Sequence, residues 1–478
     1  MKRINAILVL LLACLAASSA GQVPVPDTPA GRQFAAWLEV FNRGDRAAYQ
    51  GFLDGNYPSP AQDAEHVMAF REMTGGFDLR KVEPSTPDTQ IALLQERNSD
   101  QFARLTLAVE AAEPHKIHGI DLRAVPRPAE FPLPHLNASE LIDTARKKLD
   151  QEAAAGRFAG AALIARDGKP VLATAYGLSD RERKKANELK TRFRIGSMNK
   201  MFTATAILQL VQAGKLDLND PLGKYLSDYP NKDVATKVTI YHLLTHTGGT
   251  GDIFGPEFQA HRLELRTLDD YVKLYGSRPL PFEPGSKWEY SNYGFILLGA
   301  VIEKASGQSY YDYVRDHVFK PAGMTATGSE PEDQRVSYRS VGYTRMGGGA
   351  EHPNTETLPY RGTSAGGGYS TVEDLLKFAN ALERHELLDS LHTELLTAGK
   401  VDTPGGGGGG GGARYAFGFQ DDTINGIRCF GHGGGAPGMN GELEICPGAG
   451  YVVAVLANMD PPAASRISQF ITNRLPER

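Results

Sequence analysis

Apolar residues in the first part of the chain recur with two different spacings. Phe34, Trp37 and Phe41 follow the three-to-four-residue spacing of a helix. Between residues 105 and 109, apolar and polar residues alternate in the manner of a strand. Helices followed by strands predict a small α+β domain over residues 29–125.

Four prolines within residues 126–135 predict an extended linker after this domain. The remaining chain, residues 136–478, has strand-like segments near both of its ends and mostly helical spacing between them. We therefore expect one antiparallel sheet, flanked by helices, with an inserted helical lobe and a cleft between lobe and sheet. The expected strands are 160–166, 170–176, 423–431, 441–446 and 451–458, and the expected helices include 141–155, 372–382 and 464–475.

Composition and charge narrow the classes of partner. The 478 residues carry a formal net charge of -5, and no run of basic residues suggests binding to nucleic acid or to a membrane surface. The Cys and His residues do not have the spacing of a zinc site, so we expect no metal and no organic cofactor. The eight-glycine run at 405–412 predicts a flexible surface loop.

Residues 1–20 resemble a secretory signal peptide. Lys2 and Arg3 precede an apolar stretch, and small residues follow it as a cleavage site. An alternative is a lipoprotein signal that ends at Cys14. Either interpretation predicts a periplasmic or secreted protein without a membrane-spanning segment in its mature form. Of the three cysteines, Cys429 and Cys446 then remain, and we favour two buried thiols over a disulfide.

Ser197 and Lys200 form the first candidate for chemistry. They lie where a strand-like segment gives way to a long apolar helix, and residues three apart share one face of a helix. A serine hydroxyl becomes a good nucleophile when a base removes its proton, and an amine with a lowered pKa can be that base. The structural alternative is a helix cap at Ser197 and a solvated lysine at Lys200.

Two further clusters follow in the chain. The second is Tyr290-Ser291-Asn292, and the third is His432-Gly433-Gly434-Gly435 at the end of an expected strand. Taken alone, Tyr290 would be a core aromatic, Asn292 a helix cap and the glycines a hairpin turn. A Ser-x-x-Lys motif followed by a polar triplet and a glycine-containing strand is the pattern of serine acyl-enzymes.

Together with the segments 243–249 and 366–371, these clusters resemble those of the serine β-lactamases and penicillin-binding proteins, over roughly residues 136–478. The Tyr-x-Asn triplet is similar to that of the class C-like branch, which includes D,D-peptidases, D-amino-acid peptidases and esterases. The resemblance implies a serine hydrolase that acts on an ester or amide, with a small molecule or peptide as its substrate. D,D-carboxypeptidase activity, weak β-lactamase activity and a non-catalytic ligand-binding protein remain alternatives, and the oligomeric state stays open.

The resemblance also implies roles for single residues. Ser197 would be acylated, with Lys200 or the phenolate of Tyr290 as its base, and Lys200 with a protonated His432 would favour that phenolate. Asn292 would hold Lys200 and donate to the substrate carbonyl. The backbone N–H groups of Ser197 and Gly435 would form the oxyanion hole.

The third cluster departs from the family pattern. Lys-Thr-Gly or Lys-Ser-Gly is replaced by His432-Gly433-Gly434, which removes a hydroxyl and makes the cation titratable. We therefore expect weak or no β-lactamase activity. Gly433 and Gly434 would let a substrate backbone approach closely. His242 and His246 are interpreted as structural.

The first domain resembles the ketosteroid-isomerase-like (SnoaL-like) cone domains. The fragment 41–45, Phe-Asn-Arg-Gly-Asp, is similar to their helix–helix joint. No convincing acid–base set occurs in this part of the sequence, so we expect a structural or ligand-sensing role for it.

Overall fold

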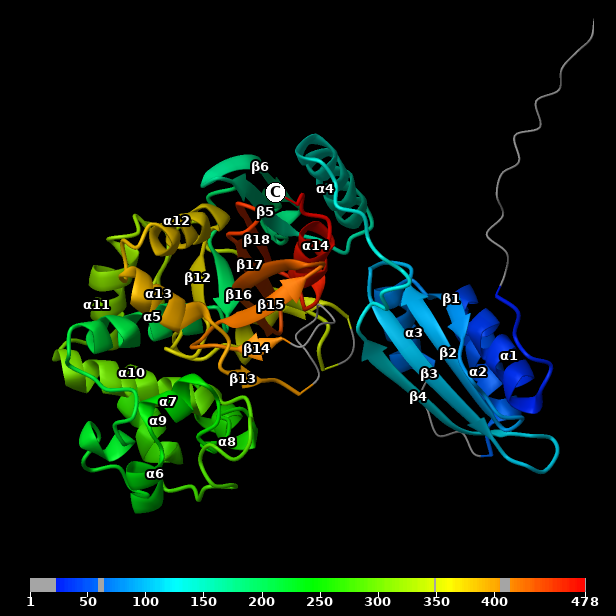
Figure 1. Ribbon diagram of the computed structural model, residues 1–478, viewed down its shortest axis with the longest axis horizontal. Coiled ribbons are helices and arrows are strands. Elements are labelled where there is room, and N and C mark those ends of the chain that lie inside the picture. Colours follow the sequence, from blue (N-terminus) through cyan, green and yellow to red (C-terminus); the bar gives the residue numbers. More distant parts are fainter. Residues whose placement is uncertain (1–22, 59–63, 348–349, 405–412, 478) are drawn as a thin grey trace, which may run out of the picture. The chain divides into compact units, whose positions relative to one another are not determined.

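A computed structural model describes residues 23–58, 64–347, 350–404 and 413–477 (Figure 1). The chain forms two compact units, Met1–Arg127 and Pro128–Arg478, and the division falls inside the proline-rich segment. The expected signal peptide and the glycine run lie outside the described residues.

The first unit packs three helices on one face of an antiparallel sheet. Gly44, with a φ of 69°, ends the first helix, and Asp45 accepts a hydrogen bond from the Ala48 N–H to begin the second. The core contains Phe34, Trp37 and the other apolar residues of the helix face. In chain order the elements are α1 (Pro29–Arg43), α2 (Arg46–Asn56), α3 (Ala64–Thr74), β1 (Phe77–Val82), β2 (Thr89–Glu96), β3 (Phe102–Val109) and β4 (Ile117–Val125), with strand order β1-β2-β3-β4.

The second unit contains an eight-stranded antiparallel sheet built from both ends of its sequence, as the sequence predicts. The strand order is β13-β14-β15-β16-β17-β18-β5-β6. The turn at Asp167 and Gly168 joins the two strands nearest the start of this unit. The bounds are β5 (Gly160–Arg166), β6 (Lys169–Tyr176), β13 (Val401–Asp402), β14 (Arg414–Tyr415), β15 (Gln420–Ile424), β16 (Ile427–Ala436), β17 (Met439–Cys446) and β18 (Tyr451–Ala457).

Helices cover both faces of this sheet. On one face α4 (Ala138–Ala154) and α14 (Ala463–Thr472) pack against alternate residues of the central strands. On the other face α5 (Asn199–Gln212), α10 (Asn292–Ser306) and α12 (Val372–Glu383) build the larger core. The small strand β9 (Phe193–Gly196), paired with β12 (Gly368–Ser370), leads into α5 on that face.

The inserted helices form a lobe, which Figure 1 shows beside the sheet around α10. It contains α6 (Lys232–Lys237), α7 (Ile240–Leu244), α8 (Pro256–His261), α9 (Leu268–Tyr275) and α11 (Tyr310–Val314). The helix α13 (Ser390–Thr397) and the short elements β7 (Leu178–Asp180), β8 (Lys185–Ala186), β10 (Tyr343–Thr344), β11 (His352–Pro353), η1 (Leu222–Lys224), η2 (Arg315–Phe319) and η3 (Asn354–Thr357) complete the second unit.

The single strand expected at 423–431 is wrong. The chain turns at Asn425 and Gly426, with φ values of 46° and 83°, and forms the hairpin of β15 and β16. Asn-Gly is a strong signal for a two-residue hairpin turn, because both positions require a positive φ.

The expectation of two free thiols is also wrong. Cys429 in β16 and Cys446 in β17 form a disulfide, with Cα atoms 4.2 Å apart. Phe430 pairs with Ile445, so the two cysteines face each other at the next position of the ladder. The pairing follows from the register of β16 against β17, which the residue types alone do not fix.

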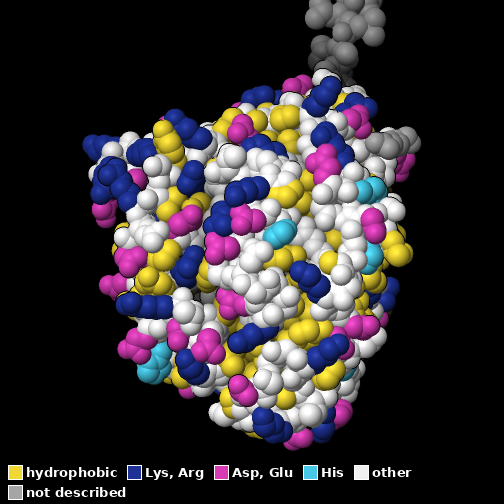
Figure 2. All heavy atoms as spheres, turned by 90° about the vertical axis from the view of Figure 1, so that its left-hand side faces the viewer, with side chains coloured by type: hydrophobic (Ala, Val, Ile, Leu, Met, Phe, Trp, Pro, Cys, Tyr) yellow, Lys and Arg dark blue, Asp and Glu magenta, His cyan; other side chains and the backbone are white. Residues whose placement is uncertain are grey.

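On the face shown in Figure 2, basic and acidic side chains are interspersed, in keeping with the small net charge. Among the helices that the structure describes, none combines the length and the apolar character needed to span a membrane.

Candidate active site

Ser197 lies in the turn between β9 and α5. Helix α5 begins at Asn199, and the Lys200 N–H donates to the Ser197 carbonyl oxygen at 2.9 Å. Ser197 therefore precedes the helix instead of sharing its face with Lys200. The turn still brings both residues to the start of a buried helix.

Lys200 is fully buried, with a relative exposure of 0%. Its Nζ donates to Asn292 Oδ1 at 2.7 Å and to the Ala365 carbonyl oxygen at 2.6 Å. Burial lowers the pKa of Lys200 to about 7, and the nearby Asp252 carboxylate opposes this shift. Two acceptors match the two N–H groups of a neutral amine, so the lone pair stays available for a proton.

Tyr290 lies next to both of these residues. Lys200 Nζ is 4.8 Å from the centroid of the Tyr290 ring, and the phenol shares a hydrogen bond with the Ser197 side chain. Burial raises the pKa of Tyr290, and the bond to Ser197 offsets only part of this. The phenol is therefore neutral near pH 7, which disfavours the phenolate among the two alternatives for the base and favours Lys200.

Asn292 is the first residue of α10, and Ser291 is the cap that accepts from the Gly294 N–H at 2.9 Å. Because Ser291 caps the helix, the Asn292 side chain can make contacts within the site. Asn292 Oδ1 holds Lys200, as the motif predicts, and Nδ2 lies 3.1 and 3.0 Å from Asp252 Oδ1 and Oδ2.

His432 is buried in β16 and is neutral. Its Nδ1 donates to the Gly433 carbonyl oxygen at 2.5 Å, and Nε2 is 3.1 Å from the Tyr415 hydroxyl. Burial and the nearby Lys200 lower the pKa of His432 to about 3. The expected protonated imidazole is therefore wrong, because the group is desolvated and lies beside another base.

The glycines that follow allow close packing within the protein. A Cβ at Gly434 would lie 1.9 Å from the Ile195 carbonyl oxygen, and one at Gly433 would lie 2.8 Å from the Glu442 carboxylate. A Cβ at Gly196 would lie 2.9 Å from the Gly435 nitrogen. The glycines thus bring β16 against the backbone beside Ser197. The space that side chains would need at Gly433 and Gly434 is thus occupied by the protein itself, and the approach of a substrate backbone to these glycines stays a prediction.

His246 packs against the aromatic rings of Tyr290 and Tyr415. Its Nδ1 accepts a hydrogen bond from the Ser291 N–H at 3.0 Å, and its ring centroid is 4.4 Å from that of Tyr290. Burial and the charge of Lys200 lower the pKa of His246, so the imidazole is neutral. His242 lies outside the site and completes a capping box with Thr239 at the start of α7.

Sequence reasoning missed three contributors: the Asp252 carboxylate, the Ala365 carbonyl and the Tyr415 hydroxyl. Asp252 follows the segment 243–249 by three residues, in a glycine-containing loop where an aspartate is common. Ala365 contributes its backbone carbonyl, which any residue type would supply, so the sequence could not identify it. The contact of Tyr415 with His432 could not be predicted either, because it depends on the order of β14, β15 and β16 in the sheet.

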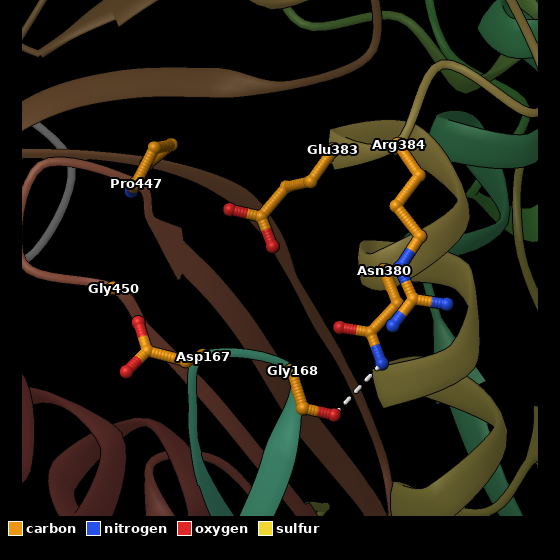
Figure 3. Close-up of a pocket in the computed structure, with 7 residues that line it drawn as sticks. All are labelled: Asp167, Gly168, Asn380, Glu383, Arg384, Pro447 and Gly450. Carbon is orange, nitrogen blue, oxygen red and sulfur yellow. Dashed lines mark hydrogen bonds between the residues drawn. The ribbon is translucent and has the colours of Figure 1, made fainter.

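A separate hollow of about 210 Å³ lies near α12 (Figure 3). Asn380 Nδ2 donates to the Gly168 carbonyl oxygen across it at 3.1 Å. The β5–β6 turn is at the opposite end of the central strands from Ser197. No hydroxyl or thiol lines this hollow, whose residues are Asp167, Gly168, Asn380, Glu383, Arg384, Pro447 and Gly450. Within the described part of the chain, no group of three or more His, Cys, Asp or Glu side chains could hold a metal ion.

Comparison with known proteins places this arrangement in a family. The model of the Beta-lactamase family matches residues 145–475. Penicillin-binding protein 4* of Bacillus subtilis is 30% identical over 304 residues, which cover 59% of this chain and 64% of that protein. The chain thus spans less than two thirds of the length of that relative. Esterase EstB of Burkholderia gladioli is 32% identical over 323 residues, covering 61% of this chain and 82% of the esterase.

A solved structure agrees with the sequence relatives. The D-stereospecific amidohydrolase from Streptomyces sp. superimposes with a TM-score of 0.58 at 27% identity, covering 68% of this chain and 97% of that one. The family match extends over more than half of the chain and includes the three clusters around Ser197. The chain belongs to the beta-lactamase family.

Proposed function

We propose that this protein is an exported hydrolase that cleaves an ester or amide through an acyl-enzyme on Ser197, of the esterase or D-amino-acid peptidase type. One observation carries the proposal. Lys200 is a buried amine with a pKa near 7 at the start of the helix that follows Ser197. A base whose pKa is close to neutrality is suited to proton transfer at physiological pH.

In the acylation step, Lys200 takes the Ser197 hydroxyl proton while Oγ forms a bond to the substrate carbonyl carbon. Tyr290, as a neutral phenol hydrogen-bonded to Ser197, can relay that proton to Lys200. The carbonyl π electrons move to oxygen, and the tetrahedral intermediate collapses as the bond to the leaving alkoxide or amine breaks. The proton held by Lys200 passes to the leaving group, and water repeats the sequence to release the acid.

The oxyanion hole would be formed by the N–H groups of Ser197 and Gly435. The close packing of Gly196 against the Gly435 nitrogen supports this pairing, because it holds β16 next to the nucleophile. Asn292 Nδ2 already contacts Asp252, so a hydrogen bond from Asn292 to the substrate would have to be made while that contact is kept.

The His432-Gly433-Gly434 cluster favours substrates without a carboxylate at that position. β-Lactams and D-Ala-D-Ala peptides present a carboxylate to a lysine and a hydroxyl in this part of the family pattern, whereas here a neutral imidazole is followed by glycine. The similarity to an esterase and to a D-stereospecific amidohydrolase supports an ester or an amide in their place.

The finer assignments are part of the same proposal. Tyr290-Ser291-Asn292 at the site supports the class C-like branch, and the helices followed by a four-stranded sheet in the first unit support a SnoaL-like domain with a ligand-sensing role. The disulfide between Cys429 and Cys446 supports export, because such bonds persist in oxidising compartments.

The test is the intact mass of the protein after exposure to a fluorophosphonate, with Ser197→Ala as the control. We expect one adduct on the wild-type protein and none on the variant. Turnover of p-nitrophenyl esters and D-alanine p-nitroanilide then separates esterase from peptidase activity. Labelling that persists in Ser197→Ala would overturn the proposal.

A further inference from the structure

We infer that Asp252 is a positioning residue for the reaction, whose carboxylate fixes the Asn292 amide so that its oxygen faces Lys200. The inference rests on the proposed function, because it concerns the base of that site. Asp252, Asn292 and Lys200 form one chain of contacts in which a neutral amide separates a carboxylate from an amine.

The contacts define which way the Asn292 amide points. Nδ2 lies 3.0 and 3.1 Å from the two oxygens of Asp252, and Oδ1 accepts from Lys200 Nζ at 2.7 Å. A carboxylate can only accept, so it selects the orientation that directs Nδ2 toward it. The rotated amide would place N–H groups against the N–H groups of Lys200. Asp252 therefore excludes the orientation in which Asn292 cannot hold the base.

The loop that carries Asp252 is hydrogen-bonded to the segment that contains Asn292. Ser291 Oγ bonds to the Gly251 carbonyl oxygen and lies 2.9 Å from Thr250 Oγ1. Arg278 Nη1 donates to the Asp252 carbonyl oxygen at 2.7 Å, and the Ile253 N–H donates to Asp252 Oδ1 at 2.6 Å. The backbone on the N-terminal side of Asp252, and its own carbonyl, are thus held independently of the carboxylate, whereas the Ile253 N–H bonds to the carboxylate and helps to orient it.

No Lys, Arg or His forms a direct ion pair with Asp252 among residues 23–58, 64–347, 350–404 and 413–477. The charge of Asp252 is thus not neutralised by a direct ionic contact. It acts on Lys200, whose pKa it raises against the effect of burial.

The other titratable groups around Lys200 come from four separate segments of the chain and are neutral near pH 7. Burial raises the pKa values of Tyr290 and Tyr415, and burial together with Lys200 lowers those of His246 and His432. Asp252 is therefore the charged partner that opposes the desolvation of Lys200. Removing that charge should make Lys200 a weaker base.

The test is the rate of fluorophosphonate labelling of the full chain between pH 5 and 9, followed by intact mass. Asp252→Asn keeps an acceptor for Asn292 but removes the charge, and Asp252→Ala removes both. We expect the acidic midpoint of the labelling rate to move down by about one pH unit in both variants. The plateau rate should fall about tenfold in Asp252→Asn and about 100-fold in Asp252→Ala, because only the alanine variant frees the amide to rotate.

Glu257→Gln is the matched control. Glu257 lies in the same part of the lobe and pairs with Arg278 Nη2 at 2.7 Å, so its substitution weakens the support of the loop without touching the Asp252 carboxylate. Its midpoint should stay unchanged and its plateau rate within twofold of the wild type. Thermal unfolding of each variant reports whether the fold is retained.

The outcomes separate the two proposals. Wild-type labelling at Ser197 with an unmoved midpoint in both Asp252 variants would overturn the role of Asp252 and leave the proposed function standing. A loss of rate that follows only the folded fraction would do the same, because it assigns Asp252 to loop stability. A wild-type protein that is never labelled would overturn the proposed function, and this inference with it.

Discussion

Two buried cations lie on either side of Ser197, and their surroundings differ. Arg194 in β9 contacts the Glu332 carboxylate directly, and Arg339 shares that carboxylate at 3.1 Å. Lys200 in α5 contacts two neutral carbonyl oxygens, and the Asn292 amide separates it from the Asp252 carboxylate. A guanidinium in a direct ion pair keeps its charge. An amine that is desolvated without such a pair titrates near neutral pH. Burial thus accompanies a structural cation in one region and the proposed base in the other.

The sharpest test of this difference is Lys200→Met. We expect kcat/KM for a p-nitrophenyl ester to fall by about 1000-fold or more, because the hydroxyl loses its base. The temperature of unfolding should stay the same or rise, since an apolar side chain replaces a desolvated amine. Ester kinetics and thermal unfolding measure the two effects. Retention of a tenth of the activity would remove Lys200 from the role of base.

Arg194→Met should give the reverse result. The substitution leaves the partly buried Glu332 carboxylate with Arg339 alone, and breaking such a pair costs about 3 kcal/mol of unfolding free energy. Activity per folded molecule should stay within tenfold of the wild type. Urea unfolding combined with active-site titration by a fluorophosphonate measures both quantities. Loss of activity without loss of stability would show that the two cations are not as different as their contacts indicate.

The pH dependence gives a smaller but more specific effect. Lys200 must be unprotonated to accept a proton, so kcat/KM should fall tenfold for each pH unit below about 7 and level off above it. His432, with a pKa of about 3, should add no second step between pH 5 and 9. A pH profile of ester hydrolysis between pH 5 and 9 tests this. A midpoint near 10 would indicate an ordinary lysine and no lowered pKa.

The motifs were sufficient to find the residues at the centre of the site. Ser197, Lys200, Tyr290 and Asn292 come from three distant segments, and the antiparallel sheet with its inserted lobe follows from strand-like segments at both ends of the domain. Spacing predicts the sheet and the lobe because the period of apolar residues is local. Tyr290 and Asn292 came instead from the resemblance to a known family, because taken alone they would have been a core aromatic and a helix cap.

The ionisation states could not be predicted, because they depend on burial and on partners from other segments. The sequence shows that His432 is titratable, but only packing against Tyr415 and Lys200 makes it neutral. Asp252 was missed for the same reason, since its partner is 40 residues away in the chain. The pairing of Cys429 with Cys446 needed the residue-by-residue register of β16 against β17, which the two expected strands did not supply.

The smallest effect is expected for His432→Gln. A glutamine can present an amide to the Tyr415 hydroxyl, so a neutral imidazole is replaced by a neutral polar group of similar reach. We expect kcat/KM to fall by about threefold, with the acidic midpoint near pH 7 unchanged, because no charge is removed from the surroundings of Lys200. The pH profile of ester hydrolysis again provides the measurement. A movement of the midpoint toward higher pH would mean that His432 carries a positive charge in the working enzyme, since removing a cation makes it easier to protonate the amine beside it.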